Sequence, residues 1–153
     1  MNGLRISLAV EADEVVVAFQ NTAKNREMIL PLGQILGGRG SPGLVQLHIV
    51  SPDGTRRRLR YTGGPGVMTG QILPYVVPMM AGSLYTVRTP LRYWRLGSDL
   101  KSIEEELARG AALQAGIEAG ESLLWKFAQC YPVKIFWSGH AVSNIVRAPV
   151  KAP

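Results

Sequence analysis

The stretch from Leu44 to Tyr61 reads LVQLHIVSPDGTRRRLRY and carries the clearest fold signal in this 153-residue chain. Every second residue from Val45 to Ile49 is apolar, which is the period of a strand with one buried face. Ser51-Pro52-Asp53-Gly54 follows, with proline at the second turn position and glycine at the fourth, a pattern typical of a type I turn. We therefore predict a β-hairpin whose returning strand runs from Arg56 to Tyr61.

Strand-like patterns recur on both sides of this hairpin. Met28 to Leu32 contains Pro31, which suits an edge strand or a bulged strand. Gly37 to Gly43 is predicted to be a loop. Short strands separated by turn residues at intervals of about 8–12 residues indicate a sandwich or a barrel. The other strands are expected at residues 4–10, 15–19, 72–80, 83–88, 133–137 and 141–146, the last two joined by a turn at Ser138-Gly139.

Residues 98–121 allow two interpretations. Ser102 and Glu105 have the spacing of a helix capping box, and Leu100, Ile103 and Leu107 share one helical face. Glycines at 110, 116 and 120 oppose a long helix, since each costs about 1 kcal/mol in a helix interior. We expect at most a short helix near 99–108, followed by a strand near 112–118. The alternative is one helical insert across the whole region.

Composition indicates one globular domain. Hydrophobic residues make up 46% of the chain and charged residues 18%, which argues against disorder. We expect a single domain over residues 1–148 and a loose C-terminal tail over 149–153. Cys130 is the one cysteine, so no disulfide within the chain can support the fold.

The formal net charge of +6 favours encounters with anionic partners without naming one. No run of about 20 apolar residues is present, so no transmembrane segment is expected. The N-terminal residues lack a basic segment followed by an apolar run. The compartment stays open: periplasmic or exported if a signal peptide has been removed, and otherwise cytoplasmic.

Four groups of residues follow one another along the chain: Asn21 with Leu32-Gly33, LVQLHIVSPDG at 44–54, Val77-Pro78 with 81–87 and 90–94, and Phe136–Gly139 with Ser143-Asn144. In this order they resemble a family of uncharacterised bacterial proteins with an immunoglobulin-like β-sandwich domain. The resemblance implies an antiparallel sandwich, no assigned reaction and often an exported location. The chain departs from the family pattern at Gly110–Leu113, where a tyrosine-bearing strand start is usual.

Two motifs raise the question of phosphate or nucleic-acid binding. Gly38-x-Gly40-x-x-Gly43 matches a dinucleotide-binding pattern by letter, but Pro42 interrupts it and a strand, not a helix, is expected after it. The Arg56–Arg60 hairpin is the densest basic run, and it is followed along the chain by Arg88, Arg92, Arg95 and Lys101 with aromatic neighbours. Alternate strand residues point to opposite faces, so Arg57 should be separated from Arg56 and Arg58. Solvated edge charge is the simpler interpretation, and nucleic acid is an unlikely partner.

Catalytic chemistry has few candidates. His48 and His140 are the two histidines, and Cys130 or a carboxylate such as one of Glu104–Glu106 would have to act with them. Two histidines on separate segments do not make a zinc site, so no metal and no cofactor is expected. Trp94, Trp137 and Tyr85 suit a sugar-binding face, although in a sandwich such aromatics more often belong to the core.

The sequence therefore favours a non-enzymatic binding or protein-interaction module of unknown ligand, with recognition placed on the loops Gly33–Gly43 and Thr62–Gly70. One alternative is a hydrolase-type enzyme that uses His48 or His140. Another is binding of nucleic acid or an anionic surface through the Arg56–Arg60 hairpin. Catalytic and ligand-binding residues are not assigned, and a protein partner is favoured.

Overall fold

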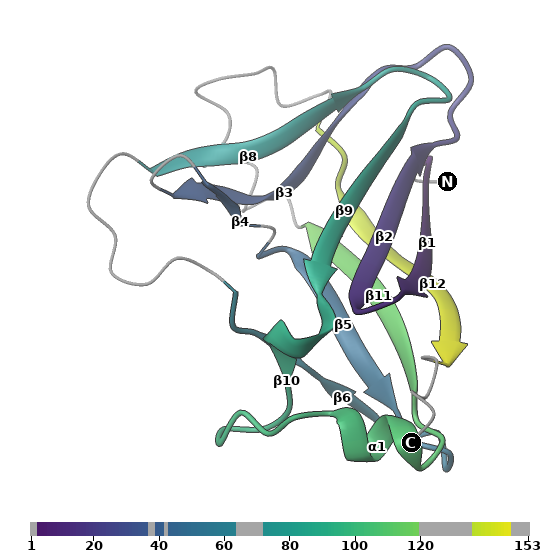
Figure 1. Cartoon of the computed structure of the whole chain (residues 1–153). Coiled ribbons are helices and arrows are strands. Elements are labelled where there is room, and N and C mark those ends of the chain that lie inside the picture. Colours follow the sequence, from purple (N-terminus) through teal and green to yellow (C-terminus); the bar gives the residue numbers. More distant parts are fainter. Residues whose placement is uncertain (1–2, 37–38, 42, 64–71, 120–135, 148–153) are drawn as a thin grey trace.

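Figure 1 shows the computed structural model of the protein, which describes residues 3–36, 39–41, 43–63, 72–119 and 136–147. Antiparallel strands dominate, with one short α-helix, which confirms the all-β prediction. The elements are β1 (Leu4–Glu11), β2 (Glu14–Asn21), β3 (Met28–Leu36), β4 (Arg39–Ser41), β5 (Val45–Val50), β6 (Arg56–Arg58), β7 (Arg60–Tyr61), β8 (Ile72–Met79), β9 (Leu84–Pro90), η1 (Leu91–Tyr93), β10 (Trp94–Arg95), α1 (Glu104–Ala108), β11 (Ala112–Ala119) and β12 (Gly139–Arg147).

One sheet has the strand order β1-β2-β9. β1 and β2 form a tight hairpin that pairs Leu4 with Asn21 at one end and Glu11 with Glu14 at the other. The apolar residues of the alternating pattern share the inner face of the sheet, where Ile6, Val17 and Phe19 are buried. The alternation in the sequence thus decides which side of this sheet faces the core.

A second sheet has the order β12-β11-β5-β6 and contains the predicted hairpin. The turn is confirmed: the Gly54 N–H donates to the Ser51 carbonyl at 2.8 Å. The returning strand, predicted as one segment over 56–61, is divided at Leu59. Leu59 is buried and donates its N–H to the Leu47 carbonyl at 2.8 Å, after which β7 pairs with β10 in another sheet.

Residues 98–121 contain a helix and a strand, so the single helical insert is wrong. α1 covers 104–108, inside the predicted range, and β11 begins at Ala112. Ser102 accepts a hydrogen bond from the Glu104 N–H at 3.3 Å, while the residue before the helix, Ile103, makes no side-chain cap. Gly110 has φ +97°, a conformation that suits glycine and lets the chain turn from the helix into β11.

The third sheet has the order β4-β3-β8 and lies at the upper left of Figure 1. β3 pairs with β8 along its length and with β4 only at Gln34–Leu36, so β4 does not reach the Met28–Leu32 segment for which an edge or bulged strand was predicted. The bulge is confirmed, because the register with β8 shifts between Pro31 and Gly33, where a residue without an N–H is tolerated. The loop predicted over 37–43 is also wrong in part, since residues 39–41 form β4 and pair with β3.

The strands continue from sheet to sheet around a single core. β9 leads through η1 to β10, which pairs with β7, and β7 continues from β6. β12 lies beside β1, where the Asn144 side chain accepts from the Leu8 N–H at 2.9 Å and donates to the Leu8 carbonyl at 3.1 Å. Inner-face residues of the β1-β2-β9 sheet and of the β12-β11-β5-β6 sheet belong to one hydrophobic cluster, together with Trp94 and Trp137.

Some predictions concern residues outside the described ranges. These are residues 133–135 of a predicted strand, Cys130, most of the loop Thr62–Gly70, and the tail 149–153. Next to them, the Trp137 N–H donates to the Ile29 carbonyl at 2.8 Å. β12 then begins at Gly139, inside the predicted Ser138-Gly139 turn, and covers the strand expected over 141–146.

Candidate functional site

Strand register places one set of side chains together on the solvent side of the β12-β11-β5-β6 sheet. His48 on β5 is opposite Gln114 on β11 and Arg58 on β6, and Gln114 is in turn opposite Ile145 on β12. Side chains opposite one another in neighbouring strands share a face of the sheet. We call this surface the outer face; it comprises Gln46, His48, Arg56, Arg58, Gln114, Glu118, His140, Val142, Ile145 and Arg147.

Two large apolar side chains of the outer face are open to solvent. Val142 is 44% exposed and Ile145 is 57% exposed, both on β12. They lie one strand away from the half-buried Gln114 and two strands away from His48. Contiguous exposed apolar side chains with a polar border are typical of interaction surfaces.

Charge on the outer face is mostly positive. Arg56, Arg58 and Arg147 are exposed there, and Glu118 is the carboxylate of the set. Among the residues that the structure describes, none of these three arginines has an ion-pair partner. The outer face therefore attracts anions, carboxylates included.

His48 lies between these charges. Burial lowers the pKa of His48 below its usual value, and the positive charges of Arg56 and Arg58 lower it further, with a smaller contribution from His140. The Nδ1 atom of His48 is buried and has no hydrogen-bond partner in the described part of the chain. A buried nitrogen without a hydrogen-bond partner is uncommon in folded proteins, and it marks His48 as the least satisfied polar side chain of the outer face.

The basic hairpin is divided between surfaces, as the alternation predicted for Arg57. The Arg57 Nη2 atom is 3.1 Å from Glu106 Oε2 and 3.3 Å from Ser51 Oγ, so it ties the hairpin to α1. Arg60 is opposite Arg95 in the separate β7–β10 pair. A continuous basic strip for nucleic acid is therefore not formed by Arg56–Arg60.

The aromatic candidates lie mainly in the core. Trp94 is buried, and its Nε1 donates to Thr89 Oγ1 at 2.8 Å. Its ring is packed against Tyr61 with centroids 4.9 Å apart. Trp137 is also buried, and Tyr85 is half-buried against the core. These side chains do not present a sugar-binding or base-stacking face.

The histidines share the outer face but do not form a catalytic pair. His48 is opposite Gln114, whereas His140 is opposite Glu118 on the far side of β11. Four residues along β11 therefore separate their register positions, although the charge of His140 still makes a small contribution to the lowered pKa of His48. Across the described residues, no group of three or more histidine, cysteine, aspartate or glutamate side chains is arranged to hold a metal ion. Of the candidate carboxylates, Glu106 is engaged by Arg57, and Cys130 lies outside the described ranges.

The glycine motif also lacks the context that a dinucleotide requires. Gly40 lies in β4, which pairs with β3, and β5 follows Gly43 after a turn. Gly38 lies outside the described ranges. A dinucleotide site of this type needs a strand, the glycine loop and then a helix N-terminus.

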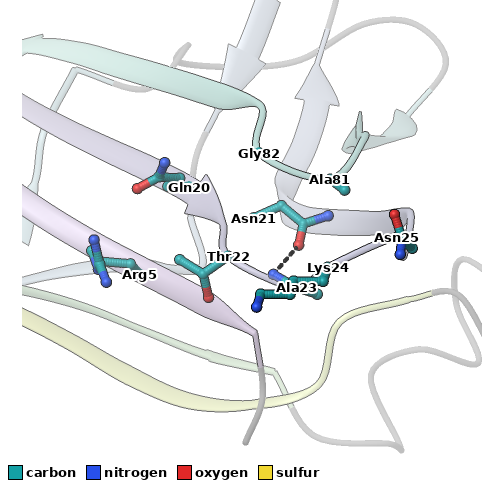
Figure 2. A pocket seen from close by; sticks show the side chains of 9 residues that line it. All are labelled: Arg5, Gln20, Asn21, Thr22, Ala23, Lys24, Asn25, Ala81 and Gly82. Carbon is teal, nitrogen blue, oxygen red and sulfur yellow. Dashed lines mark hydrogen bonds between the residues drawn. The ribbon is translucent and has the colours of Figure 1, made fainter.

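A second surface feature lies where β2 turns toward β3, and Figure 2 shows it from close by. We call it the turn pocket; it has a volume of about 520 Å³ and is lined by Arg5, Gln20, Asn21, Thr22, Ala23, Lys24, Asn25, Ala81 and Gly82. Sequence analysis assigned no function to these residues. They come from three separate segments, and only the pairing of β1, β2 and β9 brings them together.

Comparisons of the chain with family models, with curated proteins and with solved structures found no match. The immunoglobulin-like family therefore stays a prediction from the sequence. No helix in the described part of the chain has the length and apolar character needed to cross a membrane.

Proposed function

We propose that the protein is a non-enzymatic binding module whose outer face binds a protein partner. The observation that carries the proposal is the exposure of Val142 and Ile145, 44% and 57%, on a sheet face whose other side is fully committed to the core. Exposed aliphatic side chains on a rigid sheet lose little conformational entropy when a partner covers them.

The charge of the outer face indicates which kind of partner surface would be complementary to it. Arg147 lies on β12 with the apolar side chains, Glu118 lies on the adjacent β11, and Arg56 and Arg58 lie at the β6 edge of the same face. We infer a partner surface that combines carboxylates with apolar side chains. Arginine pairs well with carboxylates because its planar guanidinium can donate two parallel hydrogen bonds.

We also propose that the chain is an immunoglobulin-like sandwich domain of an exported bacterial protein. Its support is that the β1-β2-β9 and β12-β11-β5-β6 sheets direct their inner faces into one core. Such a frame would hold a binding face in a fixed geometry, and the choice of ligand comes from the side chains on it.

The test compares two exposed apolar positions on different sheets. Immobilised protein, its Ile145→Asp variant and its Leu84→Asp variant are exposed to an extract of the cells that make the protein. Leu84 is 63% exposed on β9, away from the outer face, so it serves as the matched control. A partner should be retained by the wild type and by Leu84→Asp, and lost by Ile145→Asp.

The captured protein is then purified and its affinity measured. We expect Ile145→Asp to weaken binding about tenfold or more, because a central apolar contact is replaced by a charge that repels carboxylates. Arg56→Gln should slow association and reduce its salt dependence. Equal retention by Ile145→Asp would contradict the proposal, and so would sedimentation showing that the outer face pairs with a second copy of this chain.

A further inference from the structure

The turn pocket has a positive lining. Arg5 on β1 and Lys24 in the turn after β2 are exposed, and no aspartate or glutamate is among its lining residues. Within the described ranges neither Arg5 nor Lys24 has an ion-pair partner, whereas Arg88 on the same sheet is paired with Glu11 at 3.0 Å. A smaller cavity of about 220 Å³ near Trp94 differs in this respect, because Asp13 and Glu104 line it together with Arg92 and Arg95.

The backbone beneath the turn pocket is fixed by Asn21, whose side chain is fully buried. Its Nδ2 donates to the carbonyls of Arg26 at 2.8 Å and Met79 at 3.0 Å, and its Oδ1 accepts from the Ala23 N–H at 3.0 Å, the bond drawn in Figure 2. The Asn21 carbonyl also accepts from the Gly82 N–H at 2.8 Å. The two turns that form the pocket are therefore held together before any ligand arrives, which lowers the entropic cost of binding.

Neutral donors accompany the two cations. Gln20 is half-buried on β2 beside Arg5, and Asn25 lies in the turn with φ +60°. Figure 2 shows Arg5 and Gln20 on one side of Thr22, and the ammonium end of Lys24 also extends toward Thr22. A guanidinium, an ammonium and the Gln20 carboxamide on the Thr22 side of the cavity match an oxyanion with several acceptor oxygens, whereas Asn25 lies at the opposite end in Figure 2.

We infer that the turn pocket binds a phosphate group, with Arg5 and Lys24 supplying the charge and Gln20 supplying a further donor. This site is independent of the outer face and of its protein partner. Met80 precedes the lining residue Ala81 and is 74% exposed, and Leu84, opposite the lining residue Gln20, is 63% exposed. An apolar part of the phosphate-bearing molecule therefore has a place to lie beside the pocket. The phosphate can be that of a small phosphate ester or of a lipid headgroup.

The first test is a titration of the whole chain with inorganic phosphate at constant ionic strength, followed by amide NMR shifts. We expect saturable shifts confined to residues 20–25 and 81–82. Arg5→Gln with Lys24→Gln should raise the dissociation constant about tenfold or more, since both charge-assisted contacts are removed. Arg88→Gln is the matched control and should bind phosphate as the wild type does. Absence of shifts at these residues, or equal affinity in the Arg5→Gln/Lys24→Gln variant, would overturn the inference.

The second test distinguishes the two sources of phosphate. Vesicles of phosphatidylcholine with and without phosphatidic acid are sedimented with the wild type and with a Met80→Ser/Leu84→Ser variant. Binding to phosphatidic acid vesicles that this variant loses, while its response to inorganic phosphate is kept, assigns a lipid headgroup. Binding of inorganic phosphate without any vesicle binding assigns a soluble phosphate ester. Vesicle binding that survives Arg5→Gln/Lys24→Gln unchanged contradicts the site.

Discussion

The solvent-facing sides of the β1-β2-β9 sheet and of the β12-β11-β5-β6 sheet carry different kinds of side chain. On the β1-β2-β9 sheet, Arg88 on β9 is ion-paired with Glu11 on β1, so the pair spans β2, and Val16 beside it is only 7% exposed. On the outer face of the other sheet, Ile145 is 57% exposed, and the neighbouring arginines have no ion-pair partner among the described residues.

This difference separates the outer face from the Glu11 end of the β1-β2-β9 sheet. At that end, opposite charges are paired beside a nearly buried valine, whereas Leu84 at the other end of the same face is 63% exposed beside the turn pocket. The outer face leaves aliphatic side chains in water, like charges side by side and one imidazole nitrogen unsatisfied. A folded chain gains nothing from that arrangement, whereas a partner with carboxylates and apolar side chains would complete it.

The largest expected effect is on the free energy of unfolding, and it is measured with a pair of matched substitutions, one on each sheet. Val16→Asp should destabilise the protein by about 2 kcal/mol or more, because the carboxylate loses water at a position only 7% exposed and competes with Glu11 for Arg88. Ile145→Asp should change the free energy of unfolding by less than about 0.5 kcal/mol, because that side chain already contacts water. Urea denaturation measures both. Similar losses at the two positions would contradict the comparison.

A smaller effect is expected where the two sheets meet. Asn144→Ala removes both hydrogen bonds to the Leu8 backbone and should cost about 1–2 kcal/mol. Amide exchange should rise in β1 and β12 together, since no backbone ladder joins these strands. Ser7→Ala changes an exposed neighbour on β1 and should alter neither the free energy of unfolding nor the amide exchange of β1 and β12. Faster exchange in β12 alone would show that Asn144 does not link the sheets.

The smallest effect concerns pH. The pKa of His48 is lowered in the folded state, first by burial and then by Arg56 and Arg58, so the unfolded chain binds the proton more readily. Stability should therefore fall as the pH drops through about 6.5, the ordinary pKa of histidine, and should be fully restored above it. Urea denaturation at pH 5, 6 and 7 measures this slope.

His48→Gln should remove the His48 part of the pH slope. Arg58→Gln should reduce it without abolishing it, because burial is the larger cause. An unchanged slope in His48→Gln would show that His48 does not face these charges as described.

Local pattern predicted much of this architecture. Alternation predicted β1, β2, β5 and β11, and the Ser51–Gly54 turn fixed the hairpin, because these signals depend on neighbouring residues. Strand pairing over long sequence distances was not predictable in the same way. β1 and β12 meet through Asn144, and β3 gains β4 as a second partner only beyond the bulge that follows Pro31.

The outer face shows the same limit. Its apolar residues Val142 and Ile145 lie in the predicted strand 141–146, and His48 lies in the predicted strand 45–49, but nothing in the sequence sets these strands in one sheet. β12 has a bulge, where Ser143 Oγ accepts from the Ala115 N–H at 2.9 Å. The bulge adds one residue to β12 and shifts the alternation of its side chains. Val142 and Ile145 therefore share a face although their numbers differ by three.

The most direct test of the central claim is hydrogen–deuterium exchange of the protein alone and with its captured partner. The account predicts new protection in β12, β11 and the β5–β6 hairpin, with β1, β2 and β9 unchanged. Protection confined to β1, β2 and β9, or absent from β12, would contradict the assignment of the outer face as the binding surface.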